Sequence, residues 1–129
     1  MYESLDYVYV PAADVEDAAR RYVEEFGAEL VWKVRGMGTI VACLRLSVAG
    51  PEILLSGHMM GPRPILIYRV ADYGAATAEL RRSGVRDLHE LEIPQGPCAS
   101  FYAPDGARLA IYELRRPGVI ETFAGRDDD

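Results

Sequence analysis

The chain has 129 residues and a formal net charge of −6, with 50% of its residues apolar and 26% charged. This length suits one domain with a core of its own, and the composition is typical of a soluble globular protein. An acidic chain without a basic stripe repels phosphate backbones, and no apolar run approaches the roughly 18 residues of a membrane span, so we expect neither nucleic-acid nor membrane partners.

The first half of the chain predicts a strand, a helix and three further strands. The helix starts after the capping residue Asp14, ends before Gly27, and has apolar residues at i, i+3, i+4, i+7, i+8 and i+11. These apolar residues are Val15, Ala18, Ala19, Tyr22, Val23 and Phe26. The expected elements are strand 5–10, helix 15–26 and strands 29–34, 39–48 and 52–55.

The second half repeats this order. A helix is expected over 73–83, with Asp72 as its cap and Gly84 as its stop, and strands over 65–70, 87–93, 98–102 and 108–113. Tyr7 lies seven residues before Asp14 and Ile65 lies seven before Asp72, an offset of 58 between the halves. We therefore predict an α+β fold, in which two βαβββ modules form one curved mixed sheet with its helices on the convex face.

The boundaries follow from the turns. Module one is expected over about 4–56 and module two over about 63–117, which together make one domain over 1–117. Residues 118–129 are expected to be a partly disordered C-terminal extension, because the Arg-Arg-Pro-Gly turn (115–118) ends the last strand and charged residues end the chain.

The two cysteines, Cys43 and Cys98, are far apart and belong to no CxxC pair. Lone thiols are typical of a reducing compartment, so we expect a cytoplasmic protein with both thiols buried; a single disulfide is the alternative. The N-terminus has Glu3 and Asp6 and no basic region, which is unlike a signal peptide. No nucleophile constellation is visible, and catalytic residues stay unassigned.

Three sequence pieces carry a resemblance to a known family over residues 4–117. They are LDYVYVP (5–11) leading into DVEDAA (14–19), VAD (70–72) before the second helix, and FYAPDG (101–106) before the last strand. The sequence resembles the vicinal-oxygen-chelate superfamily, which includes glyoxalase I, extradiol dioxygenases, fosfomycin-resistance enzymes and bleomycin-binding proteins. Ala103 departs from the acidic residue of the family's usual turn.

The resemblance implies four metal-ligand positions, which metal-bearing members fill with His, Gln or Glu. In this sequence the positions are Tyr7, Leu54, Ile65 and Ala110. Leucine, isoleucine and alanine have no lone-pair donor for a divalent ion, so we expect no metal and no other cofactor. A metal-dependent lyase, isomerase or dioxygenase with displaced ligands is the alternative, and the donors considered for it are Glu52, Glu113, His58 and His89.

Strand alternation places apolar residues on both faces of the sheet. Under the helices we expect Val8, Val10, Ile53, Leu55, Leu66, Tyr68, Leu109 and Ile111. In the concave cleft we expect the ligand-binding residues Tyr7, Tyr9, Glu52, Leu54, Ile65, Ile67, Ala110 and Tyr112. An apolar cleft with a few polar groups is typical of a small-molecule site.

The expected function is therefore to bind a small apolar or cationic molecule, without catalysis; a glyoxalase-like lyase or dioxygenase is the alternative. The tyrosines could instead plug the cleft, with Glu52 paired to Arg45, which would make the chain a structural module. Because two apolar sheet faces exceed what two helices can cover, we also expect a homodimer.

Overall fold

The computed structural model describes residues 1–36, 38–57 and 63–128. Its strands are β1 (Tyr2–Pro11), β2 (Glu29–Gly36), β3 (Thr39–Arg45), β4 (Glu52–Ser56), β5 (Ile65–Val70), β6 (His89–Ile93), β7 (Gly96–Tyr102) and β8 (Arg108–Tyr112). Its helices are α1 (Val15–Phe26), α2 (Tyr73–Arg82) and α3 (Pro117–Phe123). The order βαβββ followed by βαβββ, expected from the sequence, is confirmed.

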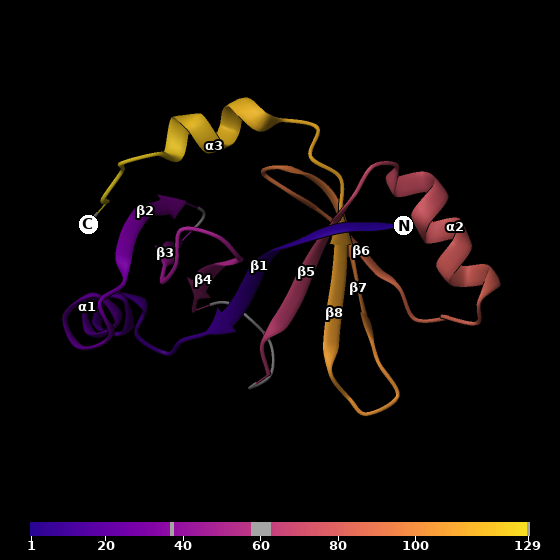
Figure 1. The fold of residues 1–129 in the computed structure, drawn as a ribbon, viewed down its shortest axis with the longest axis horizontal. Helices are drawn as coiled ribbons and strands as arrows, with labels where there is room; N and C mark the ends of the chain where they lie inside the picture. Colours follow the sequence, from indigo (N-terminus) through magenta and orange to yellow (C-terminus); the bar gives the residue numbers. More distant parts are fainter. Residues whose placement is uncertain (37, 58–62, 129) are drawn as a thin grey trace.

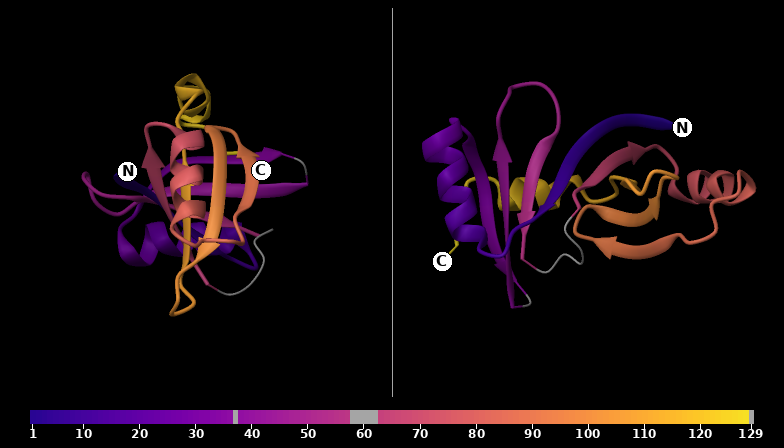
Figure 2. Two further views of the ribbon diagram at one scale, coloured as in Figure 1. Left: turned by 90° about the vertical axis from the view of Figure 1, so that its right-hand side faces the viewer. Right: turned by 90° about the horizontal axis from the view of Figure 1, so that it is seen from below.

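All eight strands form one curved sheet, in the order β2-β3-β4-β1-β5-β8-β7-β6. The two modules meet at its centre, where β1 and β5 pair antiparallel. In each module the first strand pairs parallel with the last, β1 with β4 and β5 with β8. Figures 1 and 2 show α1 and α2 at opposite ends of the molecule, each on the outer side of the strands of its own module. The predicted α+β fold is confirmed.

The first helix forms where its caps predict it. The carboxylate of Asp14 accepts a hydrogen bond from the Asp17 amide at 3.0 Å, and Gly27 ends the helix with φ of +74°. Val15 and Ala19 are buried as expected, but Val23 and Phe26 are 39% and 61% exposed. The predicted apolar stripe is therefore wrong for the last turn, which projects beyond the core.

The second helix repeats the same capping geometry. Asp72 accepts a hydrogen bond from the Ala75 amide at 3.0 Å, and the helix buries Ala76, Thr77 and Leu80 against the sheet. The prediction for this helix is confirmed to within one residue at its C-terminal end, where Ser83 is the capping residue.

Two apolar clusters lie on the convex face, one under each helix. Leu44 and Leu55 lie in the cluster under α1, and Ala99 and Ile111 in the cluster under α2. Of the residues expected under the helices, Val10, Ile53, Leu55, Leu109 and Ile111 lie in these clusters. Val8, Leu66 and Tyr68 are only half-buried. They lie on the central strands β1 and β5, between the two helices, and neither helix reaches that part of the sheet.

The C-terminal segment, residues 117–128, crosses from module two back to module one, and we call it the strap. It contains α3 and then runs along the edge of β2, where Lys33 and Asp127 form an isolated parallel bridge. Figure 1 shows α3 spanning the two modules. The residues expected to form a partly disordered extension thus include a helix and a segment that is hydrogen bonded to the edge of β2. No helix in the described part of the chain is long and apolar enough to cross a membrane.

Candidate functional site

The strand register gathers the predicted ligand-binding residues on the concave face in adjacent rows. One row runs across four strands through Glu52, Tyr7, Ile67 and Ala110, and the next runs through Leu54, Tyr9, Ile65 and Arg108. Tyr112 lies two residues beyond Ala110 on β8, where it pairs with Arg69. The topology therefore brings all eight predicted residues together at the centre of the sheet.

Most of these residues are already buried within the chain. Tyr7, Leu54, Ile67, Ala110 and Tyr112 belong to one concave cluster. The same cluster contains Trp32, Cys43 and Cys98 as buried residues, with Tyr9, Ile65, Leu114 and Phe123 packed against it. Ala110 and Tyr112 are each only 2% exposed. The floor of the expected cleft is thus covered by side chains of the protein itself.

Two carboxylates and a buried amide of the concave face lie at one end, around Tyr7. The hydroxyl of Tyr7 hydrogen bonds with the side chain of Gln95, which is itself buried. Burial raises the pKa of Tyr7 to about 12, because the phenolate would lose its hydration. Since Gln95 lies in module two, this hydrogen bond joins the two modules. We call Asp6, Tyr7, Glu52, Gln95 and Tyr112 the polar end.

Glu52 is held by groups from a neighbouring strand. Its carboxylate accepts a hydrogen bond from Nη2 of Arg45 at 2.8 Å and another from the thiol of Cys43. Burial, and then the negative charge of Glu52, raise the pKa of the Cys43 thiol. The pairing of Glu52 with Arg45, which the sequence left as one alternative, is therefore confirmed.

Asp6 is the second carboxylate of the polar end. It accepts hydrogen bonds from the hydroxyl of Tyr112 and from Oγ of Ser4, the latter at 2.6 Å. Nε of Arg69 lies 3.5 Å from Asp6, close enough for an ion pair although it makes no hydrogen bond. Burial, followed by the bond to Asp6, raises the pKa of Tyr112. The Tyr112 hydroxyl thus remains a neutral donor.

The opposite end of the concave face carries Tyr9, whose hydroxyl hydrogen bonds with the buried Ser56. Burial raises the pKa of Tyr9. Ile65 lies beside Tyr9 across the β1–β5 pair. His58, one of the alternative metal donors, lies outside the described residues.

Both cysteines are free and buried in the concave cluster, as the sequence predicts. Burial raises the pKa of Cys98 to about 12, so its thiol stays protonated near neutral pH. A protonated, enclosed thiol is a poor nucleophile. Neither cysteine therefore provides reactive chemistry at this site.

The four positions that the family resemblance implies for a metal do converge. Tyr7 and Ala110 share one row, and Leu54 and Ile65 share the adjacent row. Tyr7 supplies the only donor atom among the four, and its hydroxyl is neutral and engaged by Gln95. In residues 1–36, 38–57 and 63–128, no group of three or more His, Cys, Asp and Glu side chains could hold a metal ion. The donor set at this site does not fit a divalent metal.

Sequence reasoning missed three contributors to the site. Strict alternation along β1 would place Asp6 on the face opposite Tyr7, but a register shift between Leu5 and Tyr7 interrupts that alternation. Gln95 lies between Pro94 and Gly96, which predict only a turn and give no indication of a contact with Tyr7. Phe123 lies far along the chain from the sheet, and its ring centroid is 5.1 Å from that of Trp32.

No family model and no curated protein matches the sequence. The fold does match solved structures. Methylmalonyl-CoA epimerase from Mycobacterium tuberculosis has a TM-score of 0.68 at 23% identity, over 88% of this chain and 91% of that chain. A variant of the Streptomyces coelicolor methylmalonyl-CoA epimerase in complex with 2-nitronate-propionyl-CoA has a TM-score of 0.72 at 16% identity, over 89% and 99%.

A hypothetical protein from Bacillus halodurans C-125 has a TM-score of 0.70 at 15% identity, over 85% of this chain and 93% of that chain. These matches cover 85–89% of this chain. The chain therefore has the vicinal-oxygen-chelate fold that its sequence predicts.

Proposed function

We propose that this chain binds a small apolar molecule on the concave face of its sheet, without a metal ion. The observation that supports the proposal is the composition of that face. Trp32, Leu54, Ile67 and Ala110 belong to one buried apolar cluster, and the Gln95 amide and the carboxylates of Asp6 and Glu52 lie at one end of it. Apolar walls with a few convergent polar groups are the usual composition of small-molecule sites.

The ion pairs favour an uncharged ligand over a cationic one. Glu52 is paired with Arg45 and Asp6 with Arg69, so neither carboxylate offers an unbalanced negative charge. A cation entering the site would have to displace an arginine that is already hydrogen bonded to Glu52 or close to Asp6. An uncharged molecule can keep both pairs intact and bury only its apolar surface.

A thermal-shift screen with uncharged aromatic compounds tests this proposal. A ligand present at a hundred times its Kd stabilises the folded state by about 2.7 kcal/mol, which raises the melting temperature measurably. We expect uncharged aromatic compounds to raise it more than cationic compounds of the same size. A broad screen in which no compound shifts the melting temperature would contradict the proposal.

Ala110→Trp is the variant that tests where the ligand binds. Ala110 has the smallest side chain in its row and lies at the centre of the concave face. We expect the added ring to abolish the thermal shift and, because Ala110 is 2% exposed, to lower the free energy of unfolding by about 1–3 kcal/mol. Leu91→Trp is the matched control, since Leu91 is 43% exposed on β6. An Ala110→Trp protein that keeps the shift would place the ligand elsewhere.

The burial of the concave face also supports a second candidate, a structural module whose cleft is permanently filled. Tyr7 and Tyr112 approach each other with ring centroids 6.0 Å apart, and their hydroxyls are bonded within the chain. In that case Ala110→Trp would be destabilised and no compound would bind. The two candidates therefore differ in the result of the screen, not in the stability of the variant.

The likeness to methylmalonyl-CoA epimerases keeps a metal-dependent isomerase as the alternative enzyme class. This class needs donors that the family positions Leu54, Ile65 and Ala110 cannot supply. Elemental analysis of purified protein tests the alternative. About one Zn, Fe, Mn or Ni ion per chain, lost on Glu52→Ala, would establish a displaced metal site and contradict the proposed function.

A homodimer remains a proposal from the sequence, but the structure changes its physical basis. The concave face was expected to need a partner to cover it, whereas the strap and the neighbouring strands cover it within one chain. A dimer would then use another surface. Light scattering at micromolar concentrations tests this, and a species of 14.3 kDa at all concentrations would contradict the dimer.

A further inference from the structure

The strap lies directly on the candidate site. Phe123 packs against Trp32, with ring centroids 5.1 Å apart and an interplanar angle of 55°. The guanidinium of Arg126 lies 5.7 Å from the centroid of the Phe123 ring. Trp32 is only 4% exposed, and Phe123 and Leu114 are among the side chains that pack against its cluster. The strap thus supplies an aromatic ring where an aromatic ligand would stack on Trp32.

The strap is attached to module one by hydrogen bonds at the edge of β2, among them one from the amide of Arg35 to Oδ2 of Asp128 at 2.9 Å. The amide of Lys33 donates to the carbonyl of Arg126 at 2.7 Å, the amide of Asp128 donates to Lys33 at 2.9 Å, and that of Gly125 donates to Val31 at 3.1 Å. The ion pair of Lys33 with Asp127, at 3.2 Å, includes a carboxylate that is 64% exposed. Exposed ion pairs contribute little to stability, and β2 is paired with β3 independently of the strap, so the sheet of module one does not depend on this attachment.

The attachment to module two lies where the strap begins, at the β6–β7 turn. The carbonyl of Gln95 accepts hydrogen bonds from the amides of Arg115 at 2.9 Å and Arg116 at 3.0 Å. The Arg116 guanidinium donates to the carbonyls of Pro94 and Ile93, both at 2.8 Å. A Cβ atom at Gly96 would collide with the carbonyl oxygen of Glu113, so the β6–β7 turn lies in direct contact with the chain that leads into the strap. Motion of the strap would therefore pivot here.

We propose that the strap is a gate. It swings away from β2 about Arg115 and Arg116, and it admits a flat, uncharged aromatic molecule that replaces Phe123 against Trp32. The proposal rests on the proposed function, because it names the class of ligand for the same site and the step that lets the ligand in. The polar end stays in place during this motion, since Gln95 is held by module two.

Trp32 makes the position of the strap directly measurable, because it is the only tryptophan of the chain. Acrylamide quenching of its fluorescence reports how often the indole is exposed, with no ligand present. We expect Phe123→Ala to raise the quenching rate constant roughly threefold to tenfold, the change that corresponds to losing an aromatic pair. Gly125→Pro, which removes an amide that bonds to Val31, should have an effect in the same direction.

Glu121→Ala is the matched control, because Glu121 is an exposed residue of the same helix. It should leave quenching unchanged. Far-ultraviolet circular dichroism shows whether each variant keeps the fold. Quenching in folded Phe123→Ala and Gly125→Pro equal to that of the wild type would overturn the gate.

Stopped-flow binding of the uncharged dye Nile red separates the gate from the binding function. If opening precedes binding, the observed rate should reach a plateau with dye concentration in the wild type, and the plateau should rise in Phe123→Ala but not in Glu121→Ala. A rate that is the same in all three proteins overturns the gate and leaves the binding function standing. Increased quenching in Phe123→Ala with no dye bound by any protein supports the gate as a mobile cover and removes the binding function.

Discussion

The two modules share an element order, but their edge strands are protected from pairing with other chains in different ways. In module one the edge strand is β2, whose amide and carbonyl groups at Lys33 are bonded to the strap. In module two the edge strand is β6, which exposes Glu90 and Glu92. These glutamates form ion pairs with Arg81 and Arg116. Charged side chains on an edge strand discourage pairing with another chain, whereas a covered edge has no free groups to pair.

This difference shows how a duplicated fold becomes asymmetric. The chain has one C-terminus and can cover only one edge with it. The same segment that covers β2 crosses the concave face and places Phe123 on Trp32. The strap thus both covers the edge of β2 and closes the candidate site. In the described residues, no segment does the same for module two.

The apolar clusters on the convex face should contribute about equally to the free energy of unfolding in the two modules. Leu55 in module one is 1% exposed, and Ile111 in module two is 0% exposed. We expect Leu55→Ala and Ile111→Ala each to lower the free energy of unfolding by about 2–5 kcal/mol in urea, with one transition, because β1 and β5 join the modules. Leu91→Ala, at an exposed position, is the control. Two separate transitions would show that the modules fold independently.

The link between the modules should weaken in alkaline solution. The pKa of Tyr7 is raised to about 12, against about 10 in an unfolded chain. The stability that its neutral hydroxyl provides is therefore complete below pH 10 and is lost as the pH rises through 12. We expect the wild type to lose up to about 2 kcal/mol more than Tyr7→Phe over this interval, measured by urea denaturation.

Tyr102→Phe serves as the control for this alkaline loss, since Tyr102 is 66% exposed. Tyr7→Phe also leaves Gln95 without its partner. That cost shifts the stability at every pH and does not change the slope. Parallel curves for the wild type and Tyr7→Phe would show that the Tyr7 hydroxyl is not held in its neutral form.

The two helix caps should again be equal. Asp14 and Asp72 each accept one hydrogen bond, at 3.0 Å, from the amide three residues later. Asp14→Ala and Asp72→Ala should each lower the melting temperature by an amount equivalent to about 1 kcal/mol. Asp87→Ala, an exposed position before β6, should have no such effect. A marked difference between the two caps would mean that the repeat is equal in shape but not in energy.

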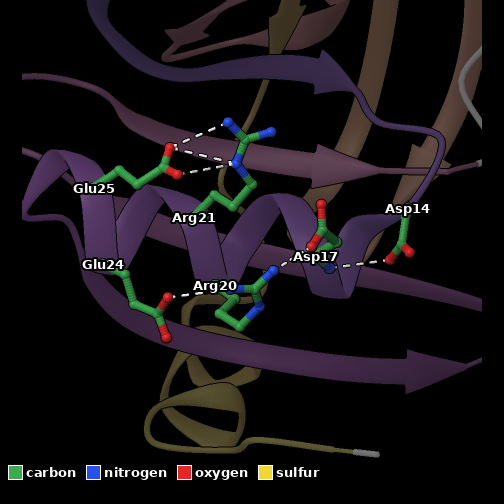
Figure 3. A network of polar contacts seen from close by, with 6 residues as sticks. All are labelled: Asp14, Asp17, Arg20, Arg21, Glu24 and Glu25. Atoms are coloured by element: carbon green, nitrogen blue, oxygen red, sulfur yellow. Dashed lines mark hydrogen bonds and ion pairs between the residues drawn. The ribbon is translucent and has the colours of Figure 1, made fainter.

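The smallest effect is expected on the exposed face of α1. Figure 3 shows Arg20 between Asp17 and Glu24, and Arg21 next to Glu25. Arg21 is 58% exposed and its ion pair measures 3.2 Å. Arg21→Ala should change the free energy of unfolding by less than about 0.5 kcal/mol, and 1 M salt should abolish the difference. An effect above 1 kcal/mol would show that this network matters more to module one than its exposure suggests.

The sequence was sufficient for elements whose signals are local. Helix 15–26 was located by its cap and its glycine, and strand 65–70 by its run of β-prone residues and the cap that follows. Strand 39–48 was predicted too long, because Leu46 to Gly50 turn away from the sheet instead of continuing it. β1 starts earlier than predicted, at Tyr2, because pairing with β5 extends it.

The candidate site was predictable only where alternation decides which face a residue takes. The eight residues expected on the concave face lie there in register. Asp6 was missed because a register shift is a property of paired strands and not of one strand's sequence. Phe123 and Gln95 were missed because tertiary packing alone places a distant helix or a turn over the sheet.

The close contact between the β6–β7 turn and the start of the strap also has an evolutionary consequence. Any side chain at position 96 would collide with the carbonyl of Glu113, so a chain that carries the strap must keep glycine there. A relative whose last strand leads elsewhere would be free of that restriction. Among sequences with this fold, glycine at position 96 should therefore occur together with a C-terminal extension that bears an aromatic residue, and it should be lost in relatives that end after β8.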